Sequence, residues 1–284
     1  MTTEKRITVR HQTWQKDYTK EKLYVFTTAV VVLLVCVLGA HWLSPYDPNA
    51  QDLQSALQAP SSVHWLGTDR YGRDMFSRVL VGGQVSIFAT LLLVAIMASV
   101  GSLIGVCCAY VGGKVEDGLM RLADLCLAFP GLVFAMAIAA VLQGGVQNAV
   151  LALAAIGWPK YARIARSLTL SLRQENFIFA AQMAGSSPWQ IMYRHILPNM
   201  MGPIVVTAVL DIGTMMMEIA GLSFLGLGAK PPVAEWGSMM SVGRSMLQTH
   251  PWVVLGPGGA IFITVVLFNL LGDTLRDYLD SKRT

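Results

Sequence analysis

Long apolar stretches alternate with short polar ones along most of the chain. A helix that crosses a bilayer needs about 20 mainly apolar residues. Six segments are long enough, with approximate ends: Leu23–Trp42, Val85–Tyr110, Leu119–Leu142, Val146–Ala165, Met200–Ala220 and Val253–Leu271. Only Gln143-Gly144-Gly145 separates the third segment from the fourth, which predicts a tight helical hairpin. The pattern therefore predicts an all-α integral membrane protein with six transmembrane helices.

The composition supports this class and argues against a large soluble domain. Hydrophobic residues make up 54% of the 284 residues and charged residues 13%, whereas soluble domains carry about 25% charged residues. The cysteines lie in apolar segments without C-x-x-C spacing, and the five histidines have no metal-ligand spacing. We therefore expect the cysteines and methionines to be packing residues, and we expect no disulfide and no metal site.

The positions of Lys and Arg predict the orientation, because cytoplasmic loops carry an excess of them. If the N-terminus is cytoplasmic, only five of the 21 basic residues fall on the outer side: Arg70, Arg73, Arg78, Lys230 and Arg244. The predicted order is a cytoplasmic segment 1–22, a first transmembrane helix 23–42, an external loop 43–84, a five-helix core 85–275 and a cytoplasmic tail 276–284. Within the core, loop 166–199 faces the cytoplasm.

Small residues and one long loop stand out in the core. Gly101 and Gly105 are four residues apart, a spacing that lets two helices approach closely. Loop 166–199 contains two amphipathic pieces around the turn Gly185-Ser186-Ser187-Pro188. Gly185 is expected to adopt a left-handed backbone, Pro188 to begin the second piece, and Pro198 to end it before the fifth span.

The two pieces are predicted to expose apolar side chains, namely Phe179, Met183, Trp189, Ile191 and Met192. An exposed apolar patch indicates a binding partner. The alternative is a pair of helices that lies on the membrane surface.

At this loop the chain resembles the permeases of ATP-binding cassette (ABC) importers. Their cytoplasmic motif, E-A-A-x3-G-x9-I-x-L-P, docks into a groove on the ATPase subunit. The matching residues here are Ala180, Ala181, Gly185, Leu197 and Pro198. Phe179 stands in place of the acidic residue, and His195 in place of the isoleucine. The resemblance implies that the matching residues couple the membrane helices to an ATPase.

Further motifs extend the resemblance to the second (C-type) permease subunit of the dipeptide, oligopeptide and nickel importers. They are "HWLGTDRYGRDMFSR" (64–78), "MRLADLCLAFP" (120–130), "RHILPN" (194–199) and "GLSFLGLGAKPPVAEWG" (221–237). "LDIGTMM" (210–216) followed by "AGLSFLGLG" is more similar to the nickel branch. The resemblance implies the type I importer fold, a bacterial inner membrane location and a cargo of peptides or nickel chelates.

The resemblance also implies the partners: a second permease subunit, two ATP-binding subunits and an extracytoplasmic substrate-binding protein. The chain has no phosphate-binding G-x4-G-K-[ST] motif, since Gly112-Gly113-Lys114-Val115 lacks both the first glycine and the Ser or Thr. We therefore expect no cofactor and no catalytic residue of its own. A stand-alone channel would not need the docking loop. A membrane-embedded serine protease would need a histidine inside a span, where only His41 lies at an edge.

Two acidic residues, Asp211 and Glu218, lie in the fifth predicted span. They are seven residues apart and so share one helix face. Acids at membrane depth usually face an interior or a cavity. They are interpreted either as a polar lining of the translocation path, attracting a cationic cargo, or as hydrogen-bonding groups toward the partner permease. Outside the membrane, the Gly-centred turns of loop 43–84 predict a folded cap over the pore mouth, and this cap or segment 221–253 is expected to contact the binding protein.

Overall fold

The computed structural model describes residues 3–280, with side chains from residue 19 onward. The predicted tail residues 281–284 lie outside the described residues. The helices are α1 (Thr3–Leu38), α2 (Ala40–Leu43), α3 (Met75–Val111), α4 (Gly113–Ala128), α5 (Gly131–Val141), α6 (Val146–Leu172), α7 (Asn176–Met183), α8 (Pro188–Ile191), α9 (Leu197–Phe224), α10 (Trp236–Gly243) and α11 (Trp252–Asp280). Between residues 3 and 280 the only β-pairing is an isolated bridge between Thr68 and Asp74. The all-α prediction is confirmed.

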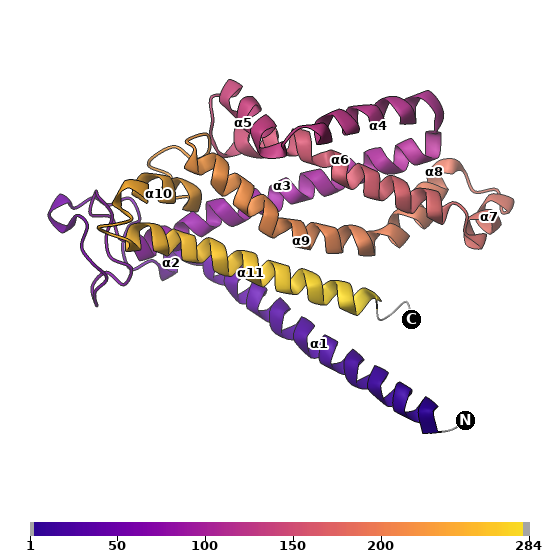
Figure 1. Ribbon diagram of the computed structural model, residues 1–284, viewed down its shortest axis with the longest axis horizontal. Helices are drawn as coiled ribbons and strands as arrows, with labels where there is room; N and C mark the ends of the chain where they lie inside the picture. Colours follow the sequence, from indigo (N-terminus) through magenta and orange to yellow (C-terminus); the bar gives the residue numbers. More distant parts are fainter. Residues whose placement is uncertain (1–2, 281–284) are drawn as a thin grey trace.

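The long helices form an elongated bundle (Figure 1). α3 and α6 make the most extensive helix pair, α9 packs against α3, α6 and α11, and α1 runs along α11 at one edge. The irregular segment 44–74 and α10 lie at one end of the bundle. α7 and α8 lie at the opposite end, which is also where both ends of the chain are found. The fold therefore separates the cap from the short helix pair by the length of the bundle.

Two glycines account for the close approach of α3 and α6. A Cβ atom built on Gly101 would lie 2.4 Å from the carbonyl oxygen of Trp158, and one on Gly105 would lie 2.2 Å from that of Ala162. Real Cβ atoms do not approach backbone oxygens so closely, so only glycine fits at either position. The predicted small-residue contact is confirmed, and its partner is α6.

The number of apolar spanning helices is smaller than predicted. By length and composition, four helical segments of the described chain are able to cross a membrane: Thr19–Leu38, Met75–Val111, Pro188–Phe224 and Trp252–Asp280. A fifth is reached only if α4 and α5 are counted as one bent span. α6 is long enough, but it carries Lys160, Arg163 and Arg166 and is not sufficiently apolar. The predicted six are obtained only when the bent pair and α6 are both included.

The third predicted span, 119–142, is not one straight helix. α4 ends at Ala128, α5 begins at Gly131, and the two helices meet at 94°. Phe129 has φ −98° and ψ 150°, which is extended backbone. A residue that precedes proline is pushed out of the helical region because the proline ring clashes with its own N–H and Cβ. Pro130 therefore breaks the span.

The prediction that Pro198 ends a helix is wrong. A π-helical turn, Met192–Ile196, joins α8 to α9, and Pro198 lies in the first turn of α9. In a regular α-helix the proline ring would clash with the carbonyl group four residues earlier. The wider π-turn, in which the N–H of Leu197 bonds to the carbonyl of Met192, makes room for the ring. The helix consequently runs without interruption from α8 into α9.

Candidate coupling surface and membrane-depth acids

The turn between α7 and α8 has the backbone that the sequence predicts. Gly185 has φ +82°. Its N–H donates to the carbonyl of Gln182, and the N–H of Ser186 donates to the carbonyl of Ala181. This pair of bonds is the Schellman motif, which satisfies the last carbonyl groups of a helix and requires a left-handed residue that is usually glycine. Gly185 therefore ends α7 and reverses the chain.

The start of α8 is fixed by a capping box. The side chain of Gln190 accepts a hydrogen bond from the N–H of Ser187 at 2.9 Å, and the Ser187 hydroxyl accepts one from the N–H of Gln190 at 3.4 Å. Pro188 occupies the first helical position, where its missing N–H costs nothing. The turn is thus internally bonded on both sides and can move as a unit. We call residues 176–191 the coupling unit.

One face of the coupling unit holds it to the bundle. Ile178 and Ile191 are fully buried in the main apolar core, and Met192 and Ile196 continue this contact through the π-turn. The sequence predicted that Ile191 and Met192 are exposed, and this prediction is wrong. The reason is helical register, since these residues point away from Trp189 and toward the bundle.

The opposite face of the coupling unit is apolar and open. Met183 is 90% exposed and Trp189 is 72% exposed, and the side chains of Phe179 and Tyr193 lie open beside them. Tyr193 follows Trp189 by four residues and therefore shares its helix face. This spacing is visible in the sequence, but Tyr193 was not included in the predicted exposed patch. An exposed patch of large apolar side chains on a rigid unit is typical of a protein–protein contact.

The five residues of the docking motif have different surroundings. Ala180, Gly185 and Pro198 are exposed, whereas Ala181 and Leu197 are half-buried. Gly185 has no atom within 4 Å of an added Cβ. The structure therefore gives the exposed three no packing role inside the chain, and Leu197 packs against the main apolar core.

Asp211 of α9 is buried and already has two partners. Lys160 Nζ lies 2.5 Å from its Oδ1, and the Tyr161 hydroxyl donates to its Oδ2 at 2.9 Å. Both partners come from α6. The charge of Asp211 is thus balanced inside the chain, and the Lys160 ammonium, whose side chain is half-exposed, is the part of this pair that a solute can reach. Lys160 was counted among the cytoplasmic cations, and its pairing with Asp211 was missed.

Glu218 is half-buried about two turns further along α9, and Asp211 and Lys160 are charged neighbours of its carboxyl group. In the part of the chain that the structure describes, no hydrogen bond or ion pair of Glu218 is found. Thr207 and Thr214 fall on the same face as the two acids. The result is a polar strip along α9 with Lys160 beside it.

The segment that the sequence predicts to be external is folded, as expected of a cap. Gly67 and Gly72 both have φ +70°. A Cβ on Gly72 would lie 1.7 Å from the carbonyl oxygen of Asp52, so two segments of the cap touch at this glycine. Asp74 caps α3 by accepting the N–H of Ser77 at 2.8 Å. At the exposed edge, the hydroxyl of Ser55 and nearby backbone N–H groups hold the pKa of the Asp52 carboxyl below its usual value.

No group of three or more His, Cys, Asp or Glu side chains suitable for a metal ion occurs among residues 19–280, whose side chains are described. The candidate sites are the coupling unit, the polar strip of α9 and the cap formed by segment 44–74.

Comparisons with known proteins show which family and which proteins the chain is similar to. The signature of the family described as "Binding-protein-dependent transport system inner membrane component" matches residues 101–284. The chain is 46% identical over 253 residues to the probable D,D-dipeptide transport system permease protein DdpC of Escherichia coli strain K12, covering 89% of this chain and 85% of that protein. It is 42% identical over 273 residues to the glutathione transport system permease protein GsiD of Shigella boydii serotype 4 strain Sb227, covering 96% and 90%.

The fold also has a counterpart among solved structures. A chain of the MetNI methionine ABC transporter, in an inward-facing conformation, superposes with a TM-score of 0.59 at 19% identity. The match covers 72% of this chain and 97% of that chain. At this identity the likeness concerns the fold alone.

Proposed function

Because this chain belongs to the family of binding-protein-dependent transport system inner membrane components and is a permease subunit of an ABC importer, we propose that it forms half of a translocation path for short peptides. Two similar permeases are named for a D,D-dipeptide and for glutathione, which is itself a tripeptide. Neither name mentions nickel, the branch that residues 210–228 favoured. Peptides are therefore the better-supported cargo.

The coupling unit is the observation that carries the mechanism. It presents an apolar face at one end of the bundle, is bonded internally through Gly185 and Ser187, and continues as one helix into α9. An ATPase subunit that docks on Trp189 and Met183 would therefore displace α9 directly. A helix pair lying on the membrane surface would need neither the rigid turn nor the continuous connection.

The remaining partners follow from the same proposal. ATP is bound and hydrolysed by two separate subunits, and the chain itself carries no cofactor. A second permease subunit completes the path, and an extracytoplasmic binding protein delivers the cargo to the cap. The complex lies in the bacterial inner membrane, and the exposed apolar faces of α4 and α5 (Leu122, Leu125, Val133 and Phe134) suit contact with lipid or with the second permease.

The experiment that tests this function measures uptake by the complete importer reconstituted in liposomes. We expect ATP-dependent accumulation of D-alanyl-D-alanine or glutathione that disappears when this chain is omitted. Accumulation of a nickel chelate without peptide would reassign the cargo. Flux through the chain alone, without ATP, would instead indicate a stand-alone channel.

We propose that both chain ends are cytoplasmic. The argument is the Lys/Arg imbalance, supported by the position of both ends at the same end of the bundle as the coupling unit and opposite the cap (Figure 1). A phosphatase reporter fused after Thr284, which is active only outside the cytoplasm, should be inactive. The same reporter inserted beside Val63 in the cap should be active, and the reverse pattern would refute the orientation.

We propose that the polar strip of α9 lines the translocation path, with Lys160 and Glu218 as its reachable charges. Asp211→Asn should lower uptake while the complex assembles normally, because asparagine keeps a hydrogen bond to Tyr161 but leaves the Lys160 ammonium without its counter-charge. A charge-assisted hydrogen bond contributes about 1.5–3 kcal/mol, so a modest loss of stability is also expected.

The matched control is Asp124→Asn, which removes the carboxylate of an exposed ion pair with Arg163. Exposed pairs contribute about 0–1 kcal/mol, and this variant should transport normally. If Asp211→Asn fails to assemble, or transports at the normal rate, the strip does not line the path.

A further inference from the structure

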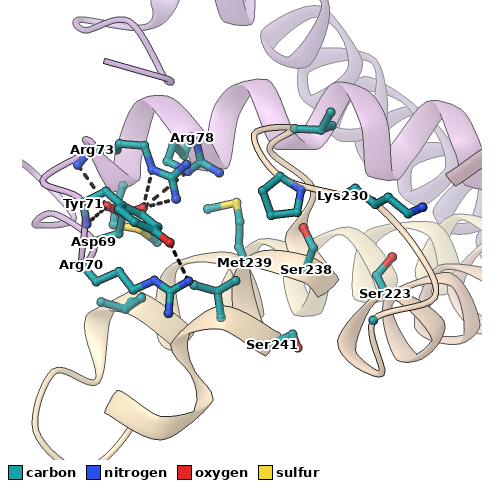
Figure 2. Close-up of a pocket in the computed structure, with 17 residues that line it drawn as sticks. Asp69, Arg70, Tyr71, Arg73, Arg78, Ser223, Lys230, Ser238, Met239 and Ser241 are labelled. Atoms are coloured by element: carbon teal, nitrogen blue, oxygen red, sulfur yellow. Dashed lines mark hydrogen bonds and ion pairs between the residues drawn. The ribbon is translucent and has the colours of Figure 1, made fainter. Parts of the chain in front are cut away.

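A pocket opens at the external end of the bundle, between the cap, the first turn of α3 and the segment that joins α9 to α10 (Figure 2). Its volume is about 190 Å³. This is smaller than the 300–1,000 Å³ or so of pockets that enclose a drug-sized ligand. The charged residues that line it are Asp69, Arg70, Arg73, Arg78 and Lys230, and Tyr71 and Ser223 are among its neutral ones.

The charges in its wall do not balance. Arg73 and Arg78 are only 6% and 4% exposed, and both face the same carboxylate, Asp69. Arg73 forms a close pair with Asp69 (Nη2 to Oδ2, 2.6 Å), whereas Arg78 Nε lies 3.9 Å from the same oxygen. Asp69 is the only acid among the lining residues, so the wall holds one buried positive charge in excess.

Apart from Asp69, the groups that hold the guanidinium of Arg78 are neutral. Arg78 Nη1 donates to the carbonyl of Pro48 at 2.8 Å and to the side-chain oxygen of Asn49 at 3.3 Å. These bonds orient the side chain but supply no negative charge. Buried charges in proteins are normally paired, so an anion at this place is the missing partner.

Two more cations stand at the rim. Arg70 is exposed and is held by Tyr71, whose hydroxyl accepts a hydrogen bond from Arg70 Nη2 at 2.7 Å. Lys230 is exposed, and no ion pair of Lys230 is found within residues 19–280. Figure 2 shows Arg70 and Lys230 on opposite sides of the pocket. A negatively charged solute is therefore attracted by Arg70 on one side and by Lys230 on the other before it reaches the buried guanidinium groups of Arg73 and Arg78.

The far wall contains a hydroxyl group without a partner. Ser223 is 2% exposed, and its Oγ has no hydrogen bond in the described part of the chain. Buried polar atoms almost always have a partner, so an unsatisfied one in a pocket wall points to a ligand. Gly228 packs directly against this serine, since a Cβ there would lie 1.8 Å from Ser223 Oγ, so a residue with a side chain does not fit beside the hydroxyl.

We propose that this pocket binds the carboxylate of a small molecule entering from outside, namely the terminal carboxylate of the transported peptide. A carboxylate supplies the missing negative charge and accepts hydrogen bonds from guanidinium groups in paired geometry. The Ser223 hydroxyl on the opposite wall is left to bond another polar group of the same molecule. The identification of the molecule as a peptide rests on the proposed function, whereas the identification of its binding group as a carboxylate rests on the residues of the pocket.

The test uses the purified importer complex in lipid nanodiscs without its binding protein. Equilibrium dialysis measures binding of radiolabelled D-alanyl-D-alanine and of its C-terminal amide. We expect the acid to bind and the amide to bind at least about tenfold more weakly, the ratio that loss of one charge-assisted contact gives. Equal binding of both probes, or no binding of the acid, would overturn the proposal.

Three variants connect the binding to this pocket. Lys230→Gln and Ser223→Ala should each weaken binding of the acid several-fold, and neither removes a contact that holds the fold together. Arg244→Gln is the matched control, because Arg244 is an exposed external cation outside the pocket wall. Loss of affinity in the control to the same degree, or normal affinity in both pocket variants, would place the binding elsewhere.

Two results separate this inference from the proposed function. If the wild-type importer fails to accumulate any peptide, the proposed cargo is wrong. If it accumulates peptide and Lys230→Gln changes only the affinity for the binding protein, the carboxylate comes from an acidic side chain of that protein, and the assignment to the cargo is overturned.

Discussion

A Gly185→Glu substitution is expected to abolish transport and to release the ATPase, while the chain remains folded in the membrane. Gly185 has φ +82°, and an added side chain in this region costs about 1 kcal/mol. Nothing inside the chain lies within 4 Å of a Cβ at this place, so the fold tolerates the space that the new side chain needs. The groove of a docked ATPase would not accommodate this side chain. Burying the glutamate carboxylate there without a partner adds to the free-energy cost of docking. Uptake and co-purification of the ATPase measure the two effects.

A matched control is available at the junction of α3 and α4. Gly113 also has a positive φ, +63°, and nothing lies within 4 Å of its added Cβ. Gly113→Glu therefore introduces the same backbone strain and the same charge outside the coupling unit, and it should retain uptake. Normal uptake by Gly185→Glu with its ATPase still bound would mean that the unit does not transmit the ATP-driven motion.

Gly105→Leu is expected to prevent folding. A Cβ at this position would lie 2.2 Å from the Ala162 carbonyl oxygen and 2.9 Å from the Arg166 amide nitrogen. Both are backbone atoms of α6, so no side chain can rotate away, and the helices must separate along their whole contact. Overpacking of a core by side chains costs about 1–3 kcal/mol, and a clash with backbone exceeds this range. The yield and the unfolding temperature of the purified chain in detergent measure the loss.

Gly259→Leu controls for the substitution itself. Gly259 lies in α11, and no atom is found within 4 Å of its added Cβ. The same change from glycine to leucine in a spanning helix should leave the yield near that of the wild type. Similar yields of Gly105→Leu and Gly259→Leu would show that α3 and α6 do not depend on this contact.

Local chemistry made the turn of the coupling unit predictable. Gly185 and Pro188 each limit the backbone within a few residues, so their roles are visible in the sequence. The same reasoning failed at Pro198, because a π-turn relieves the clash that ends most helices. It also missed the break at Pro130, although a proline within an apolar run is itself a signal of a bend.

Contacts between distant residues were not predictable. Lys160 and Asp211 are 51 positions apart, and only the packing of α6 on α9 brings their charges together. The same holds for the pocket beside the cap, where Ser223 and Arg78 are 145 positions apart in the sequence. Ile191 and Trp189 differ in exposure because of the helical register on the bundle, which a short broken helix does not reveal by its pattern alone.

The central claim is that residues 176–191 contact an ATP-binding subunit, and cross-linking tests it most directly. Ala184→Cys, at an exposed position of the turn, is introduced after the four native cysteines are replaced, with Val63→Cys in the cap as the control. In membrane vesicles containing the complete importer, a short bismaleimide should join Ala184→Cys to the ATP-binding subunit, with a yield that changes on addition of ATP, and should leave Val63→Cys unlinked. Absence of this cross-link in a complex that still contains the ATP-binding subunit would contradict the account.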